Sequence, residues 1–193
     1  NDQAQKNFSL SDTEKEDLLG IARSSIEFYL VNGEFSQIDT GRLSESLKTR
    51  LGVFVTLNKN GNLRGCIGRM TGELPLFKGV QEMAVSAATR DYRFNKVILE
   101  ELKDIDIEIS VLSPLKKINS IDEIEMGRHG IYIKKGMQSG TFLPQVATQT
   151  GWTKEEFLGH CARDKAMIGW EGWKDADLFT YEVFMFSEKD VLK

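Results

Sequence analysis

Apolar side chains near the start of the chain repeat with the spacing of a helix. Ser11 and Glu14 form a capping box, in which the two side chains bond the free amides of a helix start. From there to about Asn32, apolar residues recur every three or four positions, as on one buried face of a helix. Gly33 suits the left-handed position after a last helical turn. The pattern therefore predicts a helix over residues 12–32.

A hairpin is predicted next. Residues 53–57 are rich in β-branched side chains, which favour strands. Asn60 and Gly61 follow, and this pair is typical of a tight hairpin turn because both turn residues need a positive φ. Residues 63–68 are the expected return strand.

Further elements follow with similar signals. Pro75 begins a helix that ends near Arg90, since the first helical turn tolerates proline. Strict alternation of Ile or Val with polar residues over 105–111 predicts a strand with one buried face. The remaining expectations are a short helix over 121–125, strands over 130–134 and 178–186, a turn over 136–140, a helix over 144–150, and a helix from a second capping box at Thr153 to about Lys165.

Strands and helices are mixed along the chain, and hairpin signals outnumber signals for parallel strand–helix–strand units. This mixture predicts an α+β fold with mainly antiparallel sheets flanked by helices. Residues 10–187 are expected to form a single domain. A disordered segment is expected over 1–9 and a C-terminal tail over 188–193.

Composition narrows the class of protein. The 193 residues are 40% hydrophobic and 28% charged, which is typical of a globular chain long enough to bury a core. A net charge of −4 with no basic run makes nucleic acid an unexpected partner. No apolar stretch approaches the length of a membrane helix, and the polar start lacks a signal-peptide core. The two cysteines fit reduced thiols. We therefore expect a cytoplasmic protein without membrane association.

The segment with the most unusual composition is Leu63-Arg64-Gly65-Cys66-Ile67-Gly68. Because side chains alternate along a strand, Leu63 and Ile67 are expected to anchor it in a core, with Arg64 and Cys66 on the opposite face. A guanidinium beside a thiol favours the nucleophilic thiolate. Cys66 is therefore a candidate nucleophile, and Arg64 a candidate for binding an anion.

The glycines of this segment have two interpretations. Gly65 and Gly68 either leave the backbone open to the close approach of a ligand or mark a β-bulge. Cys66 likewise has a structural alternative, because free cysteine is often buried as a small hydrophobe.

Four other polar residues are candidates. His129 lies before a glycine at the entrance of a strand and is a candidate general base, although a surface turn residue has the same pattern. Glu108, on the polar face of its strand, either lines a cleft or faces water. Asp91 either holds Arg93 in a fixed orientation to meet an anion or forms with it a surface ion pair of little energetic value.

No metal or cofactor is expected. Cys66, His129, His160 and Cys161 have the residue types of a zinc site without its clustered spacing. The P-loop, GxGxxG, HExxH and GxSxG motifs do not occur in the sequence. Two cysteines also cannot hold the three-cysteine cluster of a radical enzyme.

Several of these segments together resemble the AMMECR-domain family, whose prokaryotic members are also called AmmeMemoRadiSam system protein A. Residues 63–68 look like the six-residue signature of that family. The resemblance spans about residues 10–187, and it departs at Met167, where the family pattern has a glycine. The other similar segments are Asp91-Tyr92-Arg93-Phe94, Glu108-Ile109-Ser110-Val111-Leu112, Gly130-Ile131, residues 140–146, Gly151-Trp152, and the helix with Phe157, Leu158 and Cys161.

The resemblance implies an α+β fold of two unequal lobes with a cleft between them, to which the signature strand contributes. It adds Phe142, Pro144 and Gln145 to the candidate binding residues. It further implies association with a Memo-like protein and a radical S-adenosylmethionine enzyme. It implies no particular activity, because fold and family do not by themselves determine function.

Two functions remain open. In the first, the protein is an accessory or binding module that presents Arg64, Cys66 and Arg93 to a protein partner or a small anionic ligand. The missing catalytic motifs favour this hypothesis. In the second, the protein is an enzyme in which Cys66 attacks a small anionic substrate, Arg64 activates the thiol or binds the substrate, and His129 and Glu108 assist.

Overall fold

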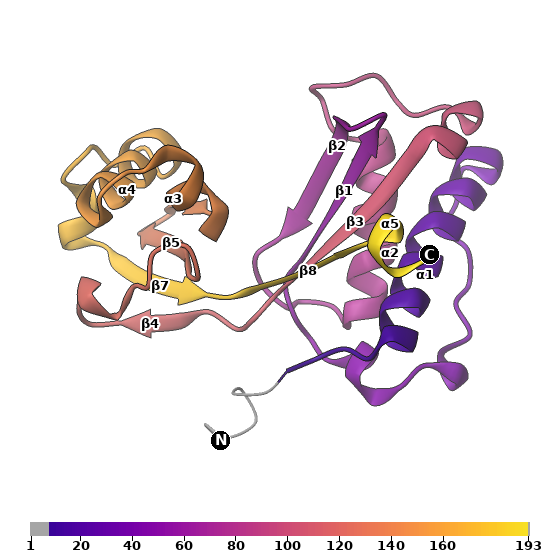
Figure 1. Ribbon diagram of the computed structural model, residues 1–193, viewed down its shortest axis with the longest axis horizontal. Helices are drawn as coiled ribbons and strands as arrows, with labels where there is room; N and C mark the ends of the chain where they lie inside the picture. The colour runs from indigo at the N-terminus through magenta and orange to yellow at the C-terminus, as the bar shows by residue number, and fades with distance from the viewer. Residues whose placement is uncertain (1–7, 193) are drawn as a thin grey trace. The chain divides into compact units, whose positions relative to one another are not determined.

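The computed structural model describes residues 8–192, and these form two compact units (Figure 1). Of the described residues, unit 1 comprises 8–112 and 184–192, and unit 2 comprises Ser113–Val183. Each unit contains a four-stranded, mainly antiparallel sheet together with helices, which confirms the α+β class. The expectation for the first residues of the chain lies, up to residue 7, outside the described residues.

Unit 1 is built on the sheet β2-β1-β3-β8, with the two long helices packed on one face (Figure 1). Val53, Val55 and Leu57 alternate along β1 and are fully buried on that face, at the centre of the core. The elements of unit 1 are α1 (Asp12–Asn32), η1 (Thr40–Arg42), η2 (Glu45–Lys48), β1 (Val53–Lys59), β2 (Asn62–Arg69), α2 (Leu76–Thr89), η3 (Leu99–Asp104), β3 (Ile105–Leu112), β8 (Val183–Ser187) and α5 (Glu188–Val191).

Local signals set the ends of these elements as the sequence predicts. Both bonds of the capping box between Ser11 and Glu14 are present at the start of α1, and Gly33 ends the helix with φ 73°. The hairpin turn between β1 and β2 has Asn60 at φ 51° and Gly61 at φ 81°. The helix predicted after Pro75 is α2. These predictions are confirmed, because each depends only on neighbouring residues.

Unit 2 is built on the sheet β4-β7-β5-β6 and has its own core. Ile131 and Ile133 of β5 are buried there with Phe157 and Leu158 of α4. The elements of unit 2 are β4 (Lys116–Ile118), η4 (Ile121–Glu123), β5 (Gly130–Lys135), β6 (Gln138–Phe142), α3 (Pro144–Thr150), α4 (Lys154–His160), the π-helical turn η5 (Cys161–Lys165), η6 (Gly172–Asp175) and β7 (Asp177–Tyr181).

Three predictions need correction here. The strand expected over 178–186 is two strands, β7 in unit 2 and β8 in unit 1, which are separated at Glu182. The turn expected over 136–140 is shorter, because residues 138–140 pair with β5 as part of β6. The helix expected to reach Lys165 is α-helical only to His160 and continues as the π-helical turn. For the two strand predictions, pairing with distant residues replaces the local preference.

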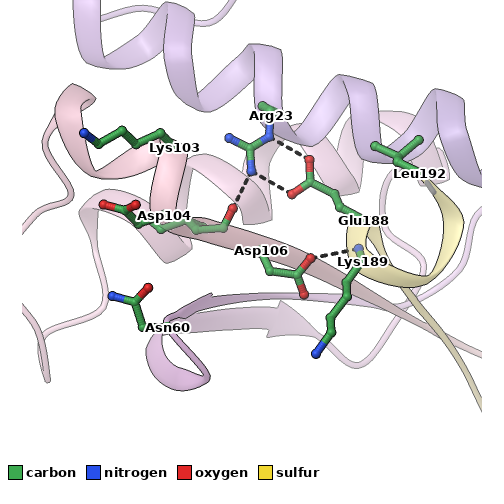
Figure 2. Close-up of a pocket in the computed structure, with 9 residues that line it drawn as sticks. Arg23, Asn60, Lys103, Asp104, Asp106, Glu188, Lys189 and Leu192 are labelled. Atoms are coloured by element: carbon green, nitrogen blue, oxygen red, sulfur yellow. Dashed lines mark hydrogen bonds and ion pairs between the residues drawn. The ribbon is translucent and has the colours of Figure 1, made fainter.

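The residues after Ser187, expected to be a tail, begin with α5, which ties the end of the chain to unit 1 (Figure 2). The carboxylate of Glu188 accepts hydrogen bonds from Arg23 Nε at 2.6 Å and Nη2 at 2.7 Å, and from the backbone amide of Ile107 at 2.8 Å. Arg23 also donates to the carbonyl oxygens of Leu102 and Ile105. Glu188 therefore joins α1, β3 and α5 through one largely buried ion pair.

We predict that Glu188→Ala lowers the free energy of unfolding by about 2 kcal/mol, since hydrogen bonds to a charged group contribute roughly 1.5–3 kcal/mol and Arg23 loses its partner. Urea unfolding with an unchanged m-value measures the loss. The control is Lys189→Ala, because this side chain points away from the cluster (Figure 2) and makes no ion pair among residues 8–192. Equal losses in the two variants would contradict the role of Glu188.

Candidate functional site

The signature strand lies in β2, at the edge of the unit 1 sheet. Its register with β1 shifts between Leu57 and Asn58, so Arg64 is an extra residue on β2, as in a β-bulge. Leu63, expected in the core, is instead 43% exposed, because the bulge changes the face to which it points. Ile67 packs against the core of unit 1, as expected.

The two glycines of the strand are sites of close packing. A Cβ atom on Gly65 would lie 2.2 Å from the carbonyl oxygen of Ala87, so glycine lets α2 approach β2. A Cβ atom on Gly68 would lie 2.2 Å from the ring of Phe54 on the neighbouring strand. Gly65 is buried and Gly68 is partly exposed, and at both positions a neighbouring group fills the space that a side chain would take, so close packing accounts for both glycines.

Arg64 is bound by a carboxylate. Its Nε and Nη2 each donate to Glu101 at 3.1 Å, and its Nη1 donates to the carbonyl oxygen of Asn95 at 2.8 Å. Glu101 also accepts from Lys59 Nζ and from the backbone amide of Ile98. The bonds from Arg64 are the main reason that the pKa of Glu101 falls to about 2. The guanidinium therefore holds the segment before η3 against β2.

Asp91 is a buried carboxylate at the outer edge of β2. It accepts from Arg93 Nε at 2.9 Å and Nη2 at 2.7 Å, and from the backbone amide of Cys66 at 2.9 Å. Arg93 Nη2 also reaches the carbonyl oxygen of Cys66 at 3.4 Å. The hydrogen bonds from Arg93 hold the pKa of Asp91 well below its usual range. The amide and the carbonyl of Cys66 point away from β1, and their hydrogen-bond partners are Asp91 and Arg93. A further strand therefore cannot pair with β2 at this residue.

An open depression of about 410 Å³ lies beside this pair. Arg93 is 46% exposed there, its guanidinium lies over the ring of Phe94, and its Nη1 has no acceptor within residues 8–192. Tyr92 is 95% exposed. The depression is lined by Arg64, Tyr92, Arg93, Phe94 and Asn95. Tyr92 and Asn95 are not among the candidate site residues predicted from the sequence, although Tyr92 lies in a segment that resembles the family; the mixture of charged and aromatic residues over 90–96 is the signal that could have found them.

Cys66 lies in a row of three polar side chains that crosses the sheet. Thr56 of β1 pairs in register with Cys66 of β2 on one side and with Glu108 of β3 on the other. The Thr56 hydroxyl lies 3.1 Å from the Cys66 sulfur. Burial, and then the charges of Asp106 and Asp190, raise the pKa of Glu108. The carboxyl of Glu108 makes no hydrogen bond to the described part of the chain.

His129 has a structural role in unit 2. Its Nδ1 accepts the backbone amide of Glu125 at 2.9 Å, and its own amide donates to the carbonyl oxygen of the same residue. These two bonds close the turn before β5. Nδ1 is therefore occupied, and Cys66 belongs to the other unit.

The other candidates in unit 2 serve mainly its core. Phe142 and Pro144 are buried, and the Phe142 ring stacks on Phe157 at 5.5 Å, whereas Gln145 is partly exposed. Burial raises the pKa of Cys161 to about 12. Phe142 and Pro144, predicted as binding residues, therefore pack in the interior of unit 2.

Two general features of the described residues bear on function. No cluster of three or more His, Cys, Asp or Glu side chains with a geometry suited to a metal ion occurs between residues 8 and 192. Over the same range, none of the helices has both the length and the apolar character that crossing a bilayer requires.

The chain is similar to one protein family, to several known proteins and to a solved structure. The model of the AMMECR1 family matches residues 19–186. A protein of Methanosarcina mazei is 36% identical over 94% of each chain, and one of Methanococcoides burtonii is 39% identical over 93% of this chain and 91% of its own. The crystal structure of an uncharacterized protein from Pyrococcus horikoshii superposes with a TM-score of 0.85 and 34% identity, over 96% of each chain.

We predict that Glu101→Gln weakens the acid dependence of stability. The folded pKa of about 2 lies below the unfolded value of about 4.3, so the stabilisation is complete above the unfolded pKa and is lost as the pH falls through the folded pKa. Glu101→Gln should be less stable than the wild type at neutral pH and lose less stability between pH ~4.3 and ~2. Urea unfolding at stepped pH measures both effects.

The matched control is Glu100→Gln, because Glu100 is exposed and forms no ion pair within residues 8–192. It should keep the wild-type acid dependence. If Glu101→Gln kept that dependence too, the pair with Arg64 would not be a determinant of acid stability.

Proposed function

This chain belongs to the AMMECR1 family, and we propose that it is a binding module that holds an anionic group in the depression beside β2. The proposal rests on the way in which the guanidinium of Arg93 is held. Two hydrogen bonds from its guanidinium to the buried carboxylate of Asp91 fix its orientation, and Nη1 remains free to donate. A carboxylate or phosphate oxygen is the acceptor that such a group binds best.

Preorganisation makes this arrangement effective. A free arginine side chain loses rotamer freedom when it binds, and that loss reduces affinity. The cost is already met in the folded protein, because Asp91 is only 2% exposed and is itself held by the amide of Cys66. Nη1 can therefore donate to a ligand without rearrangement of the pair.

The charge around the depression also favours an anion. Arg90, Arg93 and Lys96 lie on one exposed segment, where Asp91 is the carboxylate. The segment is thus locally positive in a chain with a net charge of −4. A local positive potential raises the concentration of anions nearby and speeds their association. The Memo-like and radical S-adenosylmethionine proteins suggested by the family resemblance are the first proteins to test as carriers of the anionic group.

We predict that Arg93→Ala weakens the binding of inorganic phosphate and acetate by about tenfold, since a charge-assisted hydrogen bond contributes roughly 1.5 kcal/mol or more. Titrations followed by amide NMR measure the dissociation constants and should shift resonances of residues 92–95. Asp91→Asn should also weaken binding, because it keeps Arg93 but removes a charged partner that orients it.

Arg42→Ala is the control, because Arg42 is another exposed arginine of unit 1 that is paired with an aspartate, Asp39. It should bind both anions as the wild type does. If the resonances of residues 92–95 do not move, or if Arg42→Ala has the same effect as Arg93→Ala, the depression is not an anion site.

A second candidate function, covalent thiol chemistry, is supported by the row of Cys66, Thr56 and Glu108. The hydroxyl of Thr56 contacts the sulfur, and burial raises the pKa of Glu108, which favours the protonated form of this carboxyl. Cys66 would attack an electrophilic carbon, and Glu108 would protonate the leaving group. This candidate is the weaker one, because Arg64, expected to activate the thiol, is bound by Glu101.

We predict that iodoacetamide alkylates Cys66 in the folded protein and Cys161 only after unfolding. Cys66 is half-buried, whereas Cys161 is fully buried and its raised pKa keeps its thiol protonated. Peptide mass spectrometry over time and pH gives the rate for each cysteine. If Thr56 and Glu108 influence the reactivity of the thiol, Thr56→Val and Glu108→Gln change the alkylation rate of Cys66 and its pH profile, while Glu100→Gln does not. Unchanged profiles in both variants would remove thiol chemistry from consideration.

A further inference from the structure

Large apolar side chains are exposed in the depression and on the segments that adjoin its lining residues in the sequence. Tyr92 is 95% exposed, Ile98 57%, and Leu63 and Leu99 43% each. A free phosphate or acetate ion held by Arg93 contacts few of these side chains. Single exposed apolar residues are ordinary, but several beside one binding feature indicate an interaction surface.

One set of hydrogen bonds holds these residues near each other. Leu63 directly precedes Arg64, and Ile98 and Leu99 lie within three residues of Glu101. The bonds from Arg64 to Glu101, and from the Ile98 amide to the same carboxylate, fix the start of η3 beside this end of β2. The apolar side chains are thus presented on an ordered backbone.

The charge near Arg93 indicates the kind of partner, and Glu100 beside Leu99 is the exposed carboxylate of this surface. Arg90 and Lys96 are exposed and take part in no ion pair within residues 8–192, and Arg93 keeps a free Nη1. Arginine and tyrosine are the residues that most often dominate the affinity of protein interfaces. Positive charge next to apolar side chains complements a segment that carries both carboxylates and apolar residues.

The edge of β2 restricts how such a segment is held. At Cys66 both outward backbone groups are bonded to Asp91 and Arg93. A partner therefore cannot extend the sheet at this position by strand addition, and side chains must provide the contacts.

We infer that the anionic group bound beside Arg93 is a carboxylate of an acidic, partly apolar segment of a partner protein, whose apolar residues cover Tyr92, Ile98 and Leu99. This inference rests on the proposed function and deepens it, because it names the class of ligand. The carboxylate meets Arg93 Nη1, and the apolar contacts distinguish a peptide from a free anion.

The test uses three fluorescein-labelled peptides of equal length and the full-length protein. One alternates Glu with Leu and Trp, the second alternates Glu with Ser, and the third alternates Lys with Leu and Trp. Fluorescence anisotropy should show that the Glu/Leu/Trp peptide binds about tenfold more tightly than the other two, since apolar burial and charge both contribute.

Variants separate this inference from the proposed function. The double variant Ile98→Ser/Leu99→Ser should weaken the Glu/Leu/Trp peptide by about fivefold and leave phosphate and acetate binding unchanged. Val31→Ser is the matched control, because Val31 is 63% exposed on α1, and it should change neither. Arg93→Ala should weaken both the peptide and the free anions.

Each outcome has one meaning. If the Glu/Leu/Trp and Glu/Ser peptides bind equally, the exposed apolar side chains do not contribute to binding. If phosphate and acetate bind and no peptide does, the site takes small anions only. In both cases the inference is overturned and the proposed function stands. Preferred binding of the Lys peptide, or of vesicles rich in phosphatidylserine over the Glu/Leu/Trp peptide, also overturns the inference. If neither the free anions nor the acidic peptides bind near Arg93, the proposed function fails as well.

Discussion

The carboxylate of Asp91 is the constraint on which the candidate site depends. It is almost fully buried, and four hydrogen bonds reach it, from the amides of Cys66 and Arg93 and from the guanidinium of Arg93. A buried charge is tolerated only when it is paired and hydrogen-bonded. The edge of β2 and the turn after α2 supply those partners. Without the carboxylate, the backbone groups of Cys66 would be open to another strand, and Arg93 would have no fixed orientation.

Glu101, ten residues after Asp91 in the sequence, is a second carboxylate held by cations, here Arg64 and Lys59. Both pairs join the segment between α2 and β3 to the first hairpin. The interactions that stabilise this part of unit 1 therefore also arrange its surface. A cation, an exposed aromatic ring and several apolar side chains are held on an ordered backbone, which is the composition expected of a binding surface. Binding is thus better supported by the geometry than catalysis is.

Long-range contacts explain where sequence reasoning and structure differ. The helix α1, the first hairpin and α2 were predictable, because capping, turn and periodicity signals are local. The strand over 178–186 was not, since an apolar run contains no information about which sheet each half joins. Met167 adopts φ 60°, a conformation that favours glycine, so this position departs from the family pattern in residue type and not in backbone conformation. Phe142 and Pro144 were predicted at a binding site and are buried in the structure. The difference arises because a sequence pattern alone does not distinguish core packing from ligand contact.

By itself, the sequence determined the α+β class, the principal helices and hairpin and the resemblance to the family, and it named the segment from Leu63 to Gly68 and Asp91 with Arg93 as candidates for a site. Only the tertiary structure decided what these residues contact. A single bulge turned Leu63 outward and left Arg64 as an extra residue. In the folded chain Arg64 pairs with Glu101, Arg93 pairs with Asp91, and the Thr56 hydroxyl contacts the Cys66 sulfur. Side-chain types and spacing define what a residue can bind, but the folded backbone alone determines which of the possible partners comes within reach.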